Sequence, residues 1–158
     1  MGLIRKHPFI TATLLAVLFI GGGKVLHKSR GLRNNNPGNL KELPGDSTQW
    51  VGERATDDDP IFEEFTDPKY GIRAMGRVLD SYEARGIFTV RDIIRTWAPG
   101  TENDTEAYIK SIKDQTGLIG IRRVMPSDRP AFVAGIIKHE NGVNPYSLAY
   151  IAEALALA

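Results

Sequence analysis

The sequence AFVAGIIKHENG (residues 131–142) begins as an apolar run and ends on a carboxylate that is followed closely by a Gly. Phe132, Ile136 and Glu140 are spaced by four residues, so on a helix they share one face. Glu140 therefore extends the apolar stripe, and it lies in the last helical turn, where the helix dipole disfavours negative charge. Burial and the dipole both raise the pKa of a carboxyl group, and a general acid that works near neutral pH needs a raised pKa.

Periodicity alone also allows a simpler interpretation of Glu140. In that alternative the side chain lies at the edge of the apolar stripe, points to water and pairs with Lys138 or with an Arg nearby. The two interpretations differ in whether the carboxyl group is buried.

The composition predicts one globular domain with a short appendage. The chain has 158 residues, of which 42% are hydrophobic and 25% are charged. It has no Cys, which excludes disulfides and thiolate sites, and its three His residues do not cluster, so we expect neither a metal nor a cofactor. Four of the 20 basic residues and none of the 19 acidic residues precede residue 30. The remainder is therefore slightly acidic, which argues against nucleic acid as the main partner.

Residues 8–23, PFITATLLAVLFIGGG, carry no charged side chain and have basic residues on both sides. As a helix they would span roughly 25 Å, just short of a hydrocarbon core of about 30 Å. We expect residues 1–29 to be a membrane anchor, with a single span that places residues 30–158 in the periplasm or on a virion-associated membrane. A cleaved signal peptide, followed by secretion, and a buried core helix are the alternatives.

Residues 30–158 are predicted to form an α+β domain, mainly α, with about five helices around a small antiparallel sheet. The short segments NLKEL (39–43), QWVGE (49–53) and PIFEEF (60–65) are separated by turn signals, which predicts two or three strands. Helical spacing and capping signals predict helices within residues 66–86, 89–99, 103–117, 127–142 and 144–158. The last helix is expected to start with Asn144 as N-cap and Pro145 in the first turn. Residues 27–39, HKSRGLRNNNPGN, are predicted to be a linker and a turn.

Several stretches resemble known enzymes of the bacterial cell wall. The stretch IIKHENGVNPYS (136–147) resembles the catalytic-glutamate motif of lysozyme-like lytic transglycosylases, although Asn141 stands where that family usually has Ser. The stretches RNNNPGNLK, QWVG, FEEFTDPKYGIRAMGRVLDSY and RTWAPGTENDTEAYIKSI are similar, in this order, to peptidoglycan-cleaving domains of phages and bacteria, including glucosaminidase-type ones. In lysozyme-like folds the glutamate helix normally comes first, so its late position here implies a circular permutation.

The resemblance implies a lysozyme-like fold and a glycosidase or lytic transglycosylase that cleaves the glycan strands of peptidoglycan. Glu140 would act as general acid and then as base. The combination of motifs is also similar to phage virion proteins described as structural or lytic, so we expect a phage-encoded protein for cell-wall penetration or lysis. The alternative is a non-catalytic virion or membrane structural protein that binds peptidoglycan, capsid partners or other virion proteins.

Other polar and aromatic side chains are candidates for the same site. Glu64 is a candidate second carboxylate that positions water or stabilises an oxocarbenium ion; alternatively, Glu63 and Glu64 belong to a solvated strand. Amides offer donors and acceptors to sugar groups, and Asn also suits turns, while aromatic rings stack on sugars or fill cores. The candidate substrate-binding residues are Arg33, Asn34, Asn36, Asn39, Trp50, Tyr108, Asn141 and Tyr146. Asp57, Asp58 and Asp59 lack the spacing of a calcium loop and are interpreted as solvated.

Overall fold

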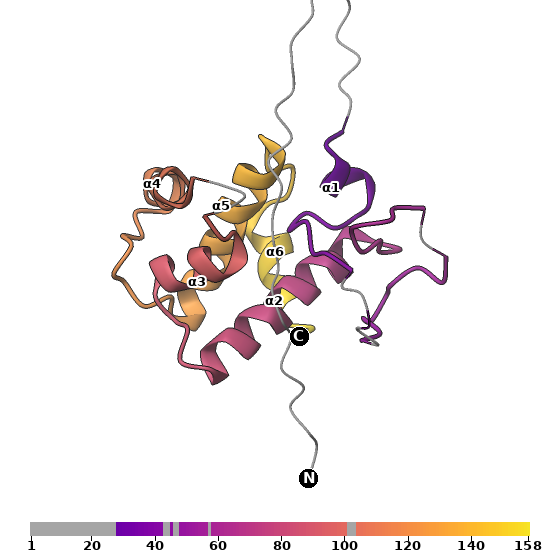
Figure 1. Cartoon of the computed structure of the whole chain (residues 1–158), viewed down its shortest axis with the longest axis horizontal. Coiled ribbons are helices and arrows are strands. Elements are labelled where there is room, and N and C mark those ends of the chain that lie inside the picture. Colours follow the sequence, from indigo (N-terminus) through magenta and orange to yellow (C-terminus); the bar gives the residue numbers. More distant parts are fainter. Residues whose placement is uncertain (1–27, 43–44, 46–47, 57, 101–103) are drawn as a thin grey trace, which may run out of the picture.

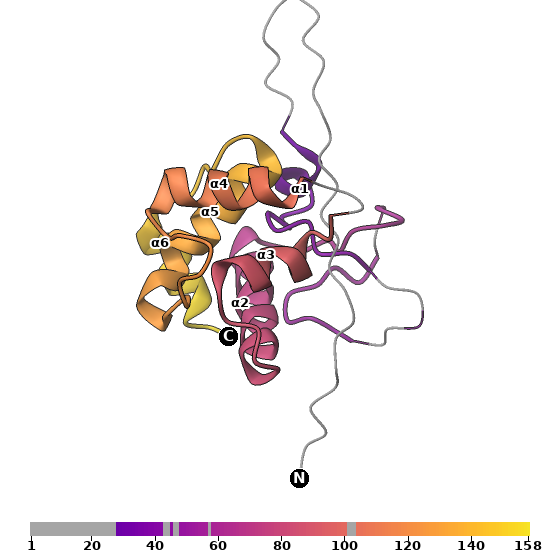
Figure 2. The same cartoon turned by 60° about the vertical axis from the view of Figure 1, so that its left-hand side comes forward.

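The computed structural model describes residues 28–42, 45, 48–56, 58–100 and 104–158, and this part is mainly helical (Figure 1). The helices are α1 (Arg30–Arg33), α2 (Pro68–Ala84), α3 (Val90–Trp97), α4 (Thr105–Thr116), the 3-10 helix η1 (Pro126–Asp128), α5 (Arg129–Asn141) and α6 (Leu148–Leu155). Helix α5 contacts α1, α4 and α6, and α2 packs against α6. In Figures 1 and 2 the segment between α1 and α2 lies to one side of the larger helices.

Side-chain caps start the long helices where the sequence predicts them. The carboxylate of Asp67 accepts a hydrogen bond from the backbone N–H of Lys69 at the start of α2, and Thr89 and Asp104 cap α3 and α4 in the same way. At the C-terminal end of α5, Gly142 adopts a left-handed conformation with φ 72°, so the helix ends at Asn141.

Two local predictions are wrong. Helix α6 begins at Leu148, later than expected, because the Ser147 hydroxyl caps it by accepting the N–H of Tyr150. Asn144 instead forms a turn, with its side-chain oxygen accepting the N–H of Tyr146. The predicted linker also contains a short helix, α1, which the Ser29 hydroxyl caps.

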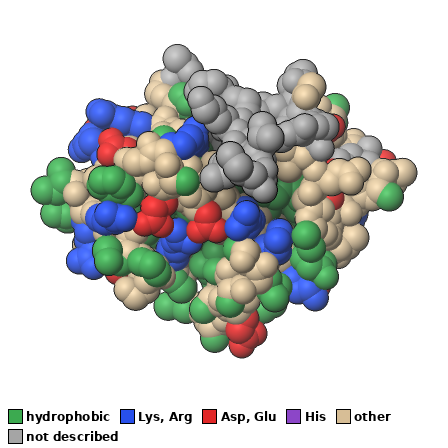
Figure 3. Space-filling model, turned by 90° about the horizontal axis from the view of Figure 1, so that it is seen from below, with side chains coloured by type: hydrophobic (Ala, Val, Ile, Leu, Met, Phe, Trp, Pro, Cys, Tyr) green, Lys and Arg blue, Asp and Glu red, His purple; other side chains and the backbone are tan. Residues whose placement is uncertain are grey.

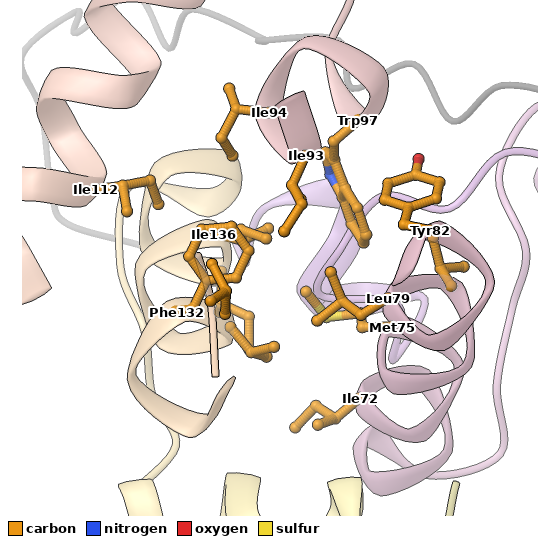
Figure 4. Packing of buried hydrophobic residues seen from close by; sticks show 14 of the residues in the cluster. Ile72, Met75, Leu79, Tyr82, Ile93, Ile94, Trp97, Ile112, Phe132 and Ile136 are labelled. Carbon is orange, nitrogen blue, oxygen red and sulfur yellow. The ribbon is translucent and has the colours of Figure 1, made fainter. Parts of the chain in front are cut away.

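The core lies where α2, α3, α4 and α5 meet, and Figure 4 shows their side chains pointing into the space between the helices. The largest of these core side chains are fully buried, and each apolar one contributes about 1.5–3 kcal/mol through its removal from water. The residues are Ile72 and Met75 of α2, Ile94 and Trp97 of α3, Ile112 of α4, and Phe132 and Ile136 of α5. The apolar stripe that precedes Glu140 therefore faces the centre of the domain.

The predicted α+β fold is wrong, because the described residues contain no strand or sheet. Backbone pairing there is limited to isolated antiparallel bridges, namely Lys41 with Phe62, Glu53 with Phe65, and Thr89 with Arg123. Side chains take the backbone donors that a ladder would use. Asp59 accepts the N–H groups of Ile61 and Phe62, and Asn36 accepts that of Leu40. The short segments separated by turn signals predicted strands, because such signals do not reveal bonds from side chains to the backbone.

The predicted N-terminal span, residues 8–23, lies outside the residues that the structure describes. Among the described helices, none is long and apolar enough to cross a membrane. Even the 17-residue helix α2 is shorter than the roughly 20 residues that a span needs, and it carries charges. The prediction of a membrane-anchored protein with an N-terminal hydrophobic helix is therefore corrected, because the described structure contains no membrane-spanning helix.

The surface mixes charges of both signs. On the face shown in Figure 3, basic side chains lie beside acidic ones with hydrophobic groups between them. Some of these charges form ion pairs between elements. The guanidinium of Arg129 lies 2.6 Å from a carboxylate oxygen of Asp80 and 2.9 Å from one of Glu83. Ion pairs near the surface, such as these half-buried ones, contribute little to stability, typically below about 1 kcal/mol. The core is therefore the main source of the fold's stability.

Replacing Ile136 by Ala tests the role of α5 in this core. Ile136 is fully buried, so the change leaves a cavity and should lower the free energy of unfolding by about 2–5 kcal/mol. Urea unfolding measures this loss. The exposed neighbour Lys138 serves as a control, because Lys138→Ala should change stability by no more than about 0.5 kcal/mol. Equal effects of the two changes would contradict the packing described above.

Candidate active site

Glu140 lies in the last turn of α5 and is buried, with 8% of its surface exposed. Both carboxylate oxygens accept a hydrogen bond. The hydroxyl of Tyr108, on α4, donates to Oε1 at 2.7 Å, and the side-chain amide of Asn39 donates to Oε2 at 3.0 Å. Three segments that are far apart in the sequence therefore meet at one carboxyl group.

Burial governs the protonation of Glu140. Loss of hydration raises the pKa of this carboxyl from 4.5 to about 7. The hydrogen bonds from Tyr108 and Asn39 act in the opposite direction, because they favour the ionised form, but burial outweighs them. Near neutral pH the group is therefore present in both its acid and its base form, which suits a residue that must give and then take a proton.

Tyr108 is fully buried and remains a neutral donor. Burial and the adjacent Glu140 carboxylate raise the pKa of the Tyr108 hydroxyl well above its usual range. The ring stacks on the imidazole of His139, with centroids 3.6 Å apart and planes inclined by 18°. Burial lowers the pKa of this half-buried His. Sequence reasoning missed the role of His139, because the stack exists only after α4 and α5 have packed together.

The Asn-rich turn, residues 34–39, is held by its own side chains. Asn36 is fully buried and donates to the carbonyls of Leu40 and Glu63 at 2.8 and 2.9 Å. It also accepts the N–H of Leu40, so its amide serves the turn and is not available to a sugar. Asn35 and Asn39 have left-handed φ values of 53° and 50°, which Asn tolerates better than most residues. This conformation places Asn39 against Glu140.

Asn141, which stands where the resembled motif has Ser, locks α5 to the turn. Its amide nitrogen donates to the carbonyls of Pro37 and Ile137, both at 2.8 Å, and its oxygen accepts the Ser29 hydroxyl at 2.5 Å. Gly31 makes this close approach possible. A Cβ there would lie 2.4 Å from the Asn39 oxygen. The structure thus gives Asn141 a positioning task next to Glu140.

The side-chain oxygen of Asn39 is buried and has no hydrogen-bond partner in the described part of the chain. An amide offers a donor on one side and an acceptor on the other. With the nitrogen facing Glu140, Asn39 stabilises the carboxylate; turned by half a rotation, its oxygen accepts the proton of the carboxylic acid. Asn39 can therefore stay bonded to Glu140 in either protonation state.

The structure does not bring Glu64 to Glu140. Glu64 is buried, but its carboxylate accepts the N–H of Asp58 at 2.7 Å and lies 3.6 Å from the guanidinium of Arg54. Glu63 is buried as well, so the interpretation of a solvated strand is wrong for both residues. The irregular path of this segment places the Glu64 carboxylate next to the backbone N–H of Asp58.

Asp59 is also buried, and its interpretation as a solvated loop residue is wrong. The guanidinium of Arg30 binds both of its oxygens, and Asn34 donates to it at 2.6 Å. These hydrogen bonds, with those from the backbone of Ile61 and Phe62, hold the pKa of Asp59 well below its usual range, although burial alone would raise it. Asp58 is exposed, and Asp57 lies outside the described residues.

A hollow of about 480 Å³ opens beside this buried ion pair, and we call it the Arg33 hollow. Its lining residues are Arg30, Arg33, Asn34, Asp58, Asp59, Pro60 and Glu64. Glu140 does not line it. The candidate residues therefore divide into two groups, with Asn39, Tyr108 and Asn141 around Glu140 and with Arg33, Asn34 and Glu64 at the hollow.

The two remaining aromatic candidates have other neighbours. Trp50 is half-buried and packs against the hydrophobic core. Tyr146 stacks on Tyr150, with ring centroids 5.5 Å apart, and burial raises the pKa of its hydroxyl to about 12. Neither side chain forms a described hydrogen bond to Glu140. Among the described residues, no group of His, Asp and Glu side chains is placed to hold a metal ion.

Comparison with known proteins finds that the chain is similar to a phage protein. The chain is 41% identical over 145 residues to Protein P5 of Pseudoalteromonas phage PM2, and the match covers 90% of each chain. No family model matches the sequence.

The raised pKa of Glu140 predicts how stability depends on pH. The folded chain retains this proton up to about pH 7 and the unfolded chain only up to about 4.5, so the contribution of the group is fully present below pH 4.5 and is lost as the pH rises to 7. The loss should be about 3 kcal/mol. In Glu140→Gln this loss should be absent, so the variant should gain stability relative to the native chain between these pH values. Urea unfolding at pH 4.5 and 7.5 measures the difference, and parallel pH profiles would contradict it.

Proposed function

The chain belongs to the family of Protein P5 from Pseudoalteromonas phage PM2, and we propose that it is a phage enzyme that cleaves the glycan strands of peptidoglycan. The observation that supports this proposal most is the state of Glu140. It is buried at the end of α5, it is held from both oxygens, and it has a pKa of about 7. The resemblance of residues 136–147 to the glutamate motif of lytic transglycosylases supports the same reaction.

In the proposed reaction Glu140 first acts as an acid. It donates its proton to the glycosidic oxygen, the bond from that oxygen to the anomeric carbon breaks, and the sugar is left as an oxocarbenium-like cation. Glu140, now ionised, then removes a proton from the group that attacks the cation. If that group is water the product has a reducing end, and if it is a hydroxyl of the same sugar the product is an anhydro sugar.

The neighbours of Glu140 fit both halves of this cycle. Tyr108 and the nitrogen of Asn39 donate to the carboxylate after the proton has left, and the oxygen of Asn39 can accept from the acid form. Glu64 is engaged with Arg54 and the backbone of Asp58, so we assign no step to it. The proposal therefore rests on a single carboxyl group.

A second candidate function has one specific observation in its favour. Only 8% of Glu140 is exposed and both of its oxygens are already bonded, which is also what a structural hydrogen-bond centre would look like. In that alternative the chain is a non-catalytic virion protein that binds peptidoglycan or other virion proteins. Activity measurements separate the two functions.

A zymogram on cell-wall peptidoglycan tests the proposal with the full chain. The native protein should clear the substrate, and Glu140→Gln should lower the rate by about 10²–10⁴-fold because the amide cannot supply the proton. Lys138→Gln, an exposed change on the same helix, should leave the rate unchanged. Mass spectrometry of the released fragments then distinguishes reducing ends from anhydro sugars. No clearing by the native chain, or equal clearing by Glu140→Gln, would support the structural alternative.

Removing the Tyr108 hydroxyl should shift the pH profile of the reaction. The hydrogen bond from Tyr108 lowers the pKa of Glu140, so Tyr108→Phe should raise this pKa and move the alkaline limb of the activity profile to higher pH. The maximal rate should also fall, because Tyr108 no longer stabilises the carboxylate that forms when Glu140 donates its proton. An alkaline limb that stays in place would exclude Glu140 as the titrating acid.

A further inference from the structure

The base of the Arg33 hollow contains charged groups whose hydrogen bonds are made to neighbouring residues of the chain. Arg30 and Asp59 form a two-point ion pair, and Asn34 and two backbone N–H groups complete the bonding of Asp59. Arg30 also lies over the ring of Phe62, 4.6 Å from its centroid. These groups have little capacity left for a ligand, so they act as the frame of the hollow.

Two charged side chains at the hollow have no partner among the described residues. Arg33 and Asp58 are both exposed, and neither side chain forms a hydrogen bond or an ion pair with a described residue. Arg33 offers a planar guanidinium that matches a carboxylate, and Asp58 offers a carboxylate that matches an ammonium group. A hollow with one charge of each sign that no described residue pairs suits a ligand that carries both.

The hollow and the Glu140 site are built on the same short piece of chain. Arg33 and Asn34 belong to the hollow, and Asn39 bonds to Glu140. Asn39 follows Arg33 by six positions, so their Cα atoms lie at most about 21 Å apart. One extended ligand can therefore contact both sites.

We propose that the Arg33 hollow binds the peptide stem of peptidoglycan while Glu140 acts on the glycan strand. The stem carries free carboxylates and a free amine. In a stem with diaminopimelate, this one residue presents both a carboxylate and an amine. Arg33 binds a carboxylate of the stem and Asp58 binds the amine. This inference rests on the proposed function, because it takes peptidoglycan as the substrate.

Calorimetric titration of the full chain carrying Glu140→Gln tests the proposal without cleavage of the probe. One probe is a disaccharide that carries a diaminopimelate-containing stem, and the other is a chitin oligosaccharide without peptide. Arg33→Gln and Asp58→Asn should each weaken binding of the stem-bearing probe about tenfold and leave chitin binding unchanged. Arg77→Gln, an exposed change on α2, is the matched control and should alter neither affinity.

Acetylation of the amine on the stem gives a second, independent readout. It should remove the effect of Asp58→Asn and retain that of Arg33→Gln, because only Asp58 faces the amine. Equal binding of the stem-bearing probe by Arg33→Gln and Arg77→Gln would overturn the proposal.

The two proposals fail in different ways. If the chain cleaves no glycan but binds the stem through Arg33, the proposed stem site is supported and the proposed enzymatic function is rejected. If cleavage depends on Glu140 but neither Arg33→Gln nor Asp58→Asn changes the affinity for the stem, the proposed enzymatic function is supported and the proposed stem site is rejected.

Discussion

A single buried carboxyl group joins the two ends of the described chain. Glu140 accepts one hydrogen bond from the turn near residue 39 and another from α4, while its own helix packs against α1, α4 and α6. Burying this group at neutral pH opposes folding, since loss of hydration raises its pKa to about 7. The apolar side chains of α5, Phe132 and Ile136 among them, offset that cost. The stability of the core is therefore what allows the acid to be kept out of water.

The segment between α1 and α2 shows how polar side chains replace a sheet. Asn36 bonds to the backbone at three points, and Asp59 takes two backbone donors together with Arg30 and Asn34. The bonds to the backbone use groups that a strand would have offered to its neighbour. The result is an irregular segment with fixed geometry. It holds Asn39 against Glu140 and also contributes Asn34 and Asp59 to the Arg33 hollow.

Much of the helical structure and part of the site could be predicted from the sequence. Caps such as Asp67 and Thr89, and the four-residue spacing that leads to Glu140, are local signals, and local signals determine where these helices begin and which face they bury. The errors arise where a side chain bonds to a distant backbone or ring. The burial of Asp59 and Glu64, and the stack of His139 on Tyr108, depend on residues at least five positions away in the chain, which periodicity does not detect.

The departure of Asn141 from the resembled motif bears on whether the site is built for chemistry. A Ser at this position could not bond to Pro37, Ile137 and Ser29 together, as the Asn amide does. The amide fixes the end of α5 against the turn, and this contact sets the distance between Asn39 and Glu140. A structural protein could gain the same contact without a buried carboxyl next to it, because an amide at position 140 would satisfy Tyr108 and Asn39 without the cost of a raised pKa. The presence of an acid in that place therefore supports the proposed proton transfer more than a purely structural role.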